Sequence, residues 1–155
     1  MNNKIQIKRQ IIEYFKGYID NRIKFHNELM DKEQTVTNMY KEAMESKHDT
    51  FKEEAQLRRD SHAAKVEYYL RLLSELLLIN PDTVCNEVTF GAIVILNNEL
   101  NLFIFASVLE EDIMIVEKYY IPINLNFPLR QTVVGKKAGE TFHFHGNEIK
   151  IEDIF

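Results

Sequence analysis

Apolar residues recur at helical spacing through most of residues 17–79, and charged residues fill the positions between them. Residues 1–80 contain one glycine, Gly17, and no proline, and they are rich in strong helix formers. The apolar stripe is narrow, which is typical of a coiled coil rather than of a globular bundle. Its members are Ile19, Ile23, Leu29 or Met30, Val36, Met39 or Tyr40, Ala43, Phe51, Ala55, Ala63, Val66, Tyr69 or Leu70, Leu73 and Leu77.

The helical pattern weakens at residues 46–50, where serine, aspartate and threonine occur. Asp49 or Thr50 followed by Glu53 forms a capping-box pattern, which predicts that one helix ends near 46 and the next starts near 50. An antiparallel hairpin centred near 48 would place Leu77 opposite about position 19. Each arm of about thirty residues would be roughly 45 Å long. The apolar run 70–79 predicts a buried base, where residues 4–16 are also expected to pack.

Beyond residue 80 the period of the apolar pattern changes to two. Pro81 favours an end to the helix before it, and the segments that follow predict an antiparallel sheet joined by short turns. Residues 128–134 predict one helical turn, closed by Gly135. The predicted fold class is therefore α+β, with a helical hairpin over 1–80, its tip near 46–50, and a small sheet domain over 81–155. The predicted strands are 88–90, 92–96, 102–108, 113–119, 141–145 and 149–154, with turns at 97–99 and 146–147.

Charge and cysteine content narrow the function classes. The net charge of the 155-residue chain is −5, with 14 basic and 13 acidic residues in 1–80, and 5 and 11 in 81–155. Neither half has the basic surface that direct nucleic-acid binding needs, so a partner with its own basic surface fits better. The lone Cys85 excludes an intramolecular disulfide and a CxxC zinc site. With no apolar run of about 18 residues and no apolar signal core at the start, we expect a cytoplasmic protein away from membranes.

Two histidines, His143 and His145, lie two apart on a predicted strand, with Phe142 and Phe144 in the alternate positions. This spacing puts both imidazoles on one face and is compatible with a metal site. No third ligand is evident, so we expect the histidines to face solvent opposite a phenylalanine core.

Three stretches of the second half resemble a known family. "VTFGAIVIL" (88–96), "FPLRQTVVGKKAGETFHF" (127–144) and "EIKIEDI" (148–154) are similar to the C-terminal domain of the bacterial Gre transcript-cleavage factors. That domain has an FKBP-like fold and follows a coiled-coil hairpin, so the resemblance covers nearly the whole chain. Phe127 stands where the family has serine, Arg130 where a small residue is usual, and Thr132 where alanine is usual. The chain thus resembles a divergent member.

The predicted tip extends this resemblance. Gre factors carry aspartate-leucine-lysine-glutamate-asparagine-alanine at the hairpin end. The stretch "DTFKEEAQ" matches at Asp49, Lys52, Glu53 and Ala55 when one residue is inserted after the aspartate, and Glu54 takes the asparagine position. Without the insertion, Thr50 occupies the aspartate position.

The resemblance implies a transcription elongation regulator that is not itself an enzyme. Its hairpin would enter the secondary channel of bacterial RNA polymerase as a monomer and meet nucleic acid only within that complex. Asp49 and Glu53, with Glu54 as a further metal ligand, would help to hold a second Mg²⁺, recruited transiently for cleavage of backtracked RNA. The loop around Asn126 and Pro128 would face the polymerase surface.

Three alternatives remain open. Carboxylates at a helix start are also ordinary capping residues, since the helix dipole favours negative charge there. The inserted residue changes the angular spacing of Asp49 and Glu53, which favours a non-cleaving modulator or inhibitor that uses the same channel. An FKBP-like domain is also compatible with a prolyl isomerase or chaperone, although the polar tip argues against an arm that clamps substrates.

Overall fold

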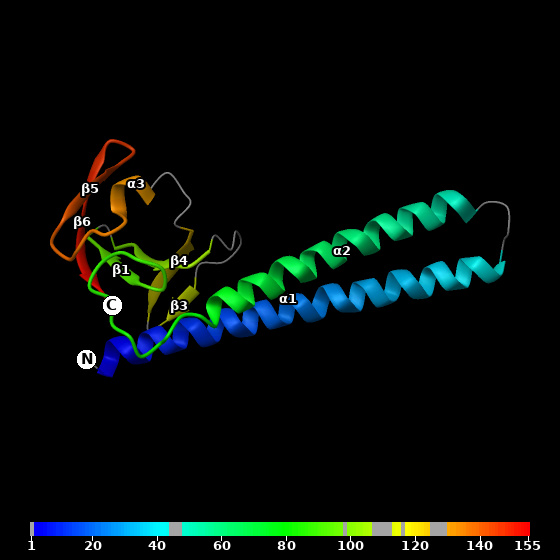
Figure 1. The fold of residues 1–155 in the computed structure, drawn as a ribbon, viewed down its shortest axis with the longest axis horizontal. Coiled ribbons are helices and arrows are strands. Elements are labelled where there is room, and N and C mark those ends of the chain that lie inside the picture. Colours follow the sequence, from blue (N-terminus) through cyan, green and yellow to red (C-terminus); the bar gives the residue numbers. More distant parts are fainter. Residues whose placement is uncertain (1, 44–47, 98, 107–112, 116, 125–129) are drawn as a thin grey trace. The chain divides into compact units, whose positions relative to one another are not determined.

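A computed structural model of the chain describes residues 2–43, 48–97, 99–106, 113–115, 117–124 and 130–155 (Figure 1). The chain divides into two compact units. One comprises Phe15–Glu75, and the other comprises Met1–Tyr14 with Leu76–Phe155. Within the described ranges, no helix is both long enough and apolar enough to cross a membrane. The fold class is the predicted one, a long helical hairpin followed by a small sheet domain.

The hairpin is formed by α1 (Asn2–Ala43) and α2 (His48–Leu76), which run antiparallel (Figure 1). The polar contacts between them include Arg22 to Tyr69, His26 to His62, and Glu33 to Arg58. The two residue numbers in each contact add up to about 90, whereas a hairpin centred near 48 would give about 96. The predicted end of the first helix near 46 lies outside the described residues, and α2 begins at His48, two residues before its predicted start.

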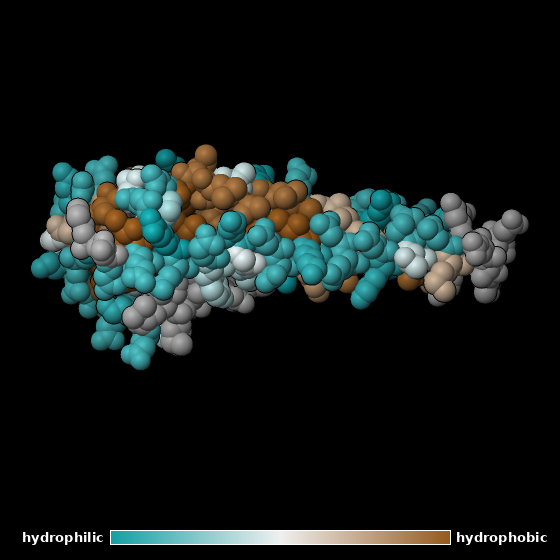
Figure 2. Space-filling model, turned by 90° about the horizontal axis from the view of Figure 1, so that it is seen from below, coloured by the Kyte–Doolittle hydropathy of each residue, from teal (hydrophilic) through white to brown (hydrophobic). Residues whose placement is uncertain are grey.

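The apolar seam of the hairpin is shorter than the sequence pattern predicts. Phe15, Ile19, Tyr69 and Leu72 are buried near its base. Three members of the predicted stripe nearer the tip are exposed, namely Val36 at 41%, Met39 at 67% and Phe51 at 53%. Two helices alone shield only the positions that face each other, so a helical period does not by itself ensure burial. The face of the hairpin seen in Figure 2 is mainly hydrophilic toward the tip.

The second helix ends at Leu76, before the apolar run is complete. Residues 77–79 form a turn in which the amide of Ile79 donates to the carbonyl of Leu76 at 3.1 Å. The predicted end near 79 was therefore three residues late. The turn leaves Leu77 and Leu78 exposed and buries Ile79.

The first turns of α1 pack within the same compact unit as the sheet. Lys8 is only 2% exposed, and its ammonium donates to the carbonyl of Thr83 at 2.8 Å and contacts the sulfur of Cys85 at 3.6 Å. A buried ammonium needs such acceptors, because its desolvation is otherwise uncompensated. Lys4 also binds Asp153, with Nζ–Oδ1 at 2.7 Å. The expected packing of residues 4–16 thus holds for the part of α1 in this unit.

In the described part of the chain, six strands form one sheet in the order β3-β4-β2-β1-β6-β5. Their pairing is antiparallel, as predicted, except that β2 and β4 run parallel, with Leu102 opposite Ile121. The chain can make this parallel pair because β3 lies between β2 and β4 in sequence. The strands are β1 (Ile93–Leu96), β2 (Asn101–Ile104), β3 (Ile113–Ile115), β4 (Lys118–Ile123), β5 (Thr141–Phe144) and β6 (Asn147–Ile154).

Several predicted strand bounds were wrong. The segment 113–119 is two strands, because the chain turns between Ile115 and Lys118 and Glu117 takes a φ of 60°. Residues 88–90 form no strand, although Val88 exchanges backbone hydrogen bonds with Gly135 and Lys136. The last hairpin turns at 145–146 instead of 146–147, with positive φ at both His145 and Gly146. Positive φ at two successive residues suits a tight two-residue turn.

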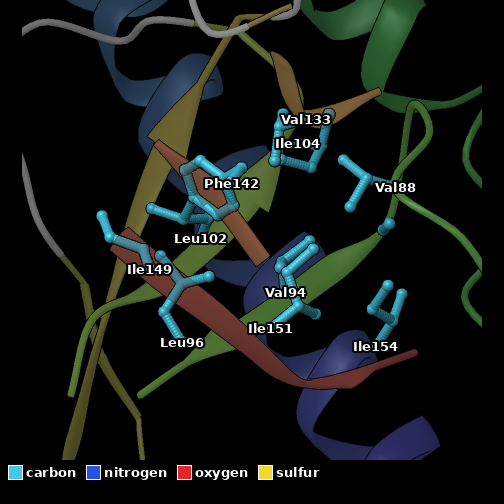
Figure 3. Close-up of a cluster of buried hydrophobic side chains, with 11 residues drawn as sticks. Val88, Val94, Leu96, Leu102, Ile104, Val133, Phe142, Ile149, Ile151 and Ile154 are labelled. Atoms are coloured by element: carbon cyan, nitrogen blue, oxygen red, sulfur yellow. The ribbon is translucent and has the colours of Figure 1, made fainter. Parts of the chain in front are cut away.

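The core of the sheet unit gathers alternate side chains of the strands (Figure 3). In β6, Ile149, Ile151 and Ile154 are buried while Lys150 and Glu152 are exposed. The short helix α3 (Arg130–Val133) adds Val133 to this core and is followed by Gly135 with a φ of 78°. It confirms the predicted helical turn over the part that the structure describes.

Gly91 is a position where the fold requires glycine, because its φ is 84° and an added Cβ would lie 3.0 Å from Cγ2 of Ile79. We expect Gly91→Ala to lower the free energy of unfolding by roughly 2–4 kcal/mol, through backbone strain plus overpacking. Gly139→Ala is the matched control: its φ is 92°, but a Cβ there meets nothing within 4 Å. It should cost only about 1–2 kcal/mol. Equal losses for the two variants in denaturant unfolding would contradict the role assigned to Ile79.

Candidate functional site

The predicted tip carboxylates stand at the start of α2. Asp49 is the second residue of this helix, and Glu53 follows one turn later. Helix positions four apart lie on the same side, with Cβ atoms about 5–6 Å from each other. The side chains of residues 40–49 lie outside the described part of the structure, so only Glu53 and Glu54 of the predicted set are placed. Both are exposed.

Glu54 is engaged by a cation that the sequence analysis did not single out. Arg58 lies one turn further along α2, and its Nη1 is 3.9 Å from Oε2 of Glu54. Its Nε is 3.1 Å from Oε1 of Glu33 on α1. One guanidinium thus joins the two helices and offsets the charge of Glu54. The four-residue spacing of Glu54 and Arg58 was the available sequence signal.

Glu53 lies in a groove of about 680 Å³ on the hairpin. No ion pair among the described residues involves Glu53. Lys52 and Arg59 line the same groove, together with Gln34 and Thr37 from α1. The groove therefore combines one carboxylate with two cations and several hydrogen-bonding groups.

The described donor set fits a recruited Mg²⁺ at Glu53 better than at Glu54. Mg²⁺ takes oxygen ligands and keeps several waters, so one or two carboxylates suffice to recruit it. Glu53 has an exposed carboxylate for this purpose, whereas Glu54 is already near Arg58. Among the described side chains, no group of three or more histidine, cysteine, aspartate or glutamate residues could hold a metal ion. Of the two predicted ligands whose side chains are described, Glu54 is therefore the weaker candidate.

The sheet domain carries a second candidate surface. A groove of about 570 Å³ is lined by Glu99, Glu117 and Glu152, with Lys118 as its cation and Tyr119 beside it. Three carboxylates against one lysine make this groove acidic, in keeping with the negative charge of residues 81–155. The predicted contact residues Asn126 and Pro128 lie outside the described residues. The acidic groove was not predicted, because its residues come from three separate stretches of the chain, 95–101, 117–119 and 152.

His143 and His145 are both exposed, which confirms the expectation that they face solvent. His143 is exposed on β5, while Phe142 is buried in the core and Phe144 packs against it. His145 lies in the following turn, where its ring centroid is 4.1 Å from that of Phe144. The two imidazoles therefore do not share one strand face as predicted.

Comparison with solved structures gave four matching chains, three of which are described below. No protein-family model matches the chain, and no curated protein matches it. A structure of the transcription factor Gfh1 is 13% identical, with a TM-score of 0.38, over 90% of this chain and 92% of the other. GreA factor homolog 1 (Gfh1) of Thermus thermophilus is 13% identical, with a TM-score of 0.35, over 90% and 94%. Gfh1 of Thermus aquaticus is 14% identical, with a TM-score of 0.33, over 89% and 92%. TM-scores this low carry no functional conclusion.

Arg58 should stabilise the hairpin only slightly, because its side chain is half exposed. In a double-mutant cycle of Glu33→Gln and Arg58→Met, we expect a coupling energy below about 1 kcal/mol that shrinks as salt is added. Arg59→Met is the control, since no ion pair among the described residues involves Arg59. The measurement is the free energy of unfolding in denaturant. A coupling that salt leaves unchanged would show that the pair is more deeply buried than the structure indicates.

Proposed function

We propose that this chain is a regulator of RNA polymerase that inserts its helical hairpin into the secondary channel of the enzyme. In the leading form of the proposal, the tip stimulates cleavage of backtracked RNA by the active site of the polymerase. The observation that carries it is a long hairpin that ends in carboxylates at positions 49 and 53, one helical turn apart. The stretches at 88–96, 127–144 and 148–154 that resemble the Gre factors support it independently.

The hairpin is long enough to place its tip far from its base. The 29 residues of α2 correspond to roughly 43 Å of helix. The described side chains near the tip include the exposed charges of Lys52, Glu53 and Glu54, next to exposed apolar residues such as Met39 and Phe51. The charges suit contact with a charged, hydrated site.

The chemistry assigned to the tip needs few residues. Asp49 and Glu53 would hold the Mg²⁺ between them and the polymerase, and Glu53 would orient a water by accepting its hydrogen bond. When bound, the ion would lower the pKa of the attacking water and offset charge at the leaving oxygen. Lys52, next to Glu53, would favour the approach of the negative RNA backbone. The chain itself forms no covalent bond, and the reacting groups belong to the polymerase complex.

A second function uses the same insertion without cleavage. Arg58 offsets Glu54, and both Lys52 and Arg59 share the groove with Glu53. Nearby cations weaken the attraction of a carboxylate for a divalent ion. This surrounding charge favours a modulator or inhibitor that occupies the channel.

Transcript cleavage in stalled elongation complexes tests the leading form. Wild type should accelerate RNA cleavage, and Asp49→Ala or Glu53→Ala should reduce that stimulation on the order of 100-fold, because each removes a charge that acts in the transition state. Glu67→Ala is the control, since Glu67 is an exposed carboxylate of α2 that lies 14 residues beyond Glu53. The Glu67→Ala variant should stimulate cleavage by the polymerase as strongly as wild type does.

Polymerase binding, measured in parallel, separates the alternatives. Binding without stimulation, together with competition against a known channel-binding factor, would select the non-cleaving modulator. A failure to bind polymerase at all would reject both forms, and a proline-peptide isomerisation assay would then test the remaining alternative.

The acidic groove of the sheet domain should contribute to docking on a basic polymerase surface. We expect Glu99→Gln with Glu117→Gln to weaken binding roughly tenfold at low salt, with a smaller effect at high salt, because the attraction is screened. The matched control is Glu87→Gln with Glu148→Gln, which removes two exposed charges outside the groove. Equal weakening by both pairs would point to net charge and not to this groove.

A further inference from the structure

Two histidines contact each other between the helices of the hairpin, at a position where a coiled coil would ordinarily bury apolar residues. Nδ1 of His26 on α1 lies 3.0 Å from Nδ1 of His62 on α2, which is a hydrogen-bond distance. His26 is 6% exposed, and its ring stacks on Tyr69 with centroids 5.9 Å apart. The contact is therefore a polar junction within the hairpin seam.

The hydrogen bond of this junction can form only while at least one of the two imidazole rings is neutral. In a hydrogen bond between two imidazole nitrogens, one donates and the other accepts. If both rings are protonated, two N–H donors face each other and the bond cannot form. Nε2 of His26 is buried and has no hydrogen-bond partner among the described residues. A protonated His26 would thus bury an unpaired N–H as well as a charge, which is costly.

The surrounding charges act in the same direction from both helices. Burial lowers the pKa of His26 first, and Arg22, His62 and Lys65 lower it further through their positive charge. Arg22 belongs to α1, and His62 and Lys65 belong to α2. Tyr69 faces the pair as well, but its hydroxyl accepts a hydrogen bond from Nε of Arg22 at 3.3 Å.

The sign of the pH effect follows from this shift. A histidine with a folded-state pKa below its unfolded value of about 6.5 binds fewer protons in the folded state. Its contribution to stability is complete above about pH 6.5 and is lost as the pH falls through the folded-state pKa. Acid therefore destabilises the junction.

The junction matters because the described residues between it and the tip bury little apolar surface between the helices. Between the histidine pair and the tip, Ala55 is the one buried apolar residue among those described. The other described contacts across this part include the half-exposed Arg58 with Glu33. Loss of the junction would leave the tip-side half of the hairpin with few cross-helix contacts.

We propose that His26 and His62 form a pH-sensitive junction that holds the two helices together at neutral pH and releases the tip-side half of the hairpin in acid. This inference goes beyond the proposed function, because it concerns the hairpin alone. It does not depend on polymerase.

Hydrogen exchange of the full chain tests the junction. Protection factors, corrected for the intrinsic effect of pH, are compared at about pH 7.5 and about pH 5, which bracket histidine titration. Wild type should lose protection on the order of tenfold in residues 27–39 and 50–61, while residues 147–154 of the sheet change little. An equal loss in the hairpin and in the sheet would overturn the proposal.

Two substitutions of His26 remove its titration in different ways. His26→Phe keeps a ring on Tyr69, and His26→Gln keeps a hydrogen-bonding group that does not titrate. Both should lose less than about threefold of the tip-side protection in acid. His143→Gln is the control, because His143 is exposed on β5, and it should behave like wild type. If His26→Phe does not fold, His26→Gln decides alone, and an acid loss equal to that of wild type rejects the junction.

Discussion

The narrowness of the seam between α1 and α2 is the constraint on which the hairpin depends. Two helices can bury only the side chains that face each other, and here the apolar part of that strip is concentrated near Phe15, Ile19, Tyr69 and Leu72. Beyond it, the described cross-helix contacts include the His26–His62 pair and the ion pair of Arg58 with Glu33. The exposed charges of this part can enter a hydrated environment, although Met39 and Phe51 are exposed beside them. The same feature makes the distal hairpin responsive to charge.

Charge also distinguishes the two ways in which the proposed regulator would act. A tip with free carboxylates suits recruitment of a divalent ion, whereas a tip whose carboxylates are offset by arginine and lysine suits occupation of a channel. Glu53 has the first character and Glu54 the second. The local balance depends on Arg58 and Arg59, which are close to the tip only because α2 brings successive turns together. The sheet domain adds an acidic groove assembled from distant segments.

Periodicity and turn chemistry were enough to predict the order of elements. The long helical pattern, its break before residue 50 and the change to a period of two beyond Pro81 all correspond to features of the structure. Bounds were less accurate where a local signal was weak. Glu117 takes a positive φ although glutamate gives no hint of a turn, so the split of 113–119 into β3 and β4 was missed. The parallel pairing of β2 with β4 could not be predicted from the alternation of apolar residues, since parallel and antiparallel strands share a period of two.

By itself, the sequence determined the helical hairpin, the change to strands beyond Pro81 and the charged residues of the tip, because these follow from local spacing and residue chemistry. The tertiary structure decided which apolar residues are buried, since burial depends on the partner surface: Ala55 is covered, whereas Met39 and Phe51 are not. It also decided the register of the hairpin, which brings His26 against His62 and Arg58 against Glu33. Contacts between residues so far apart in the chain depend on how the helices pair, and no local pattern contains that information.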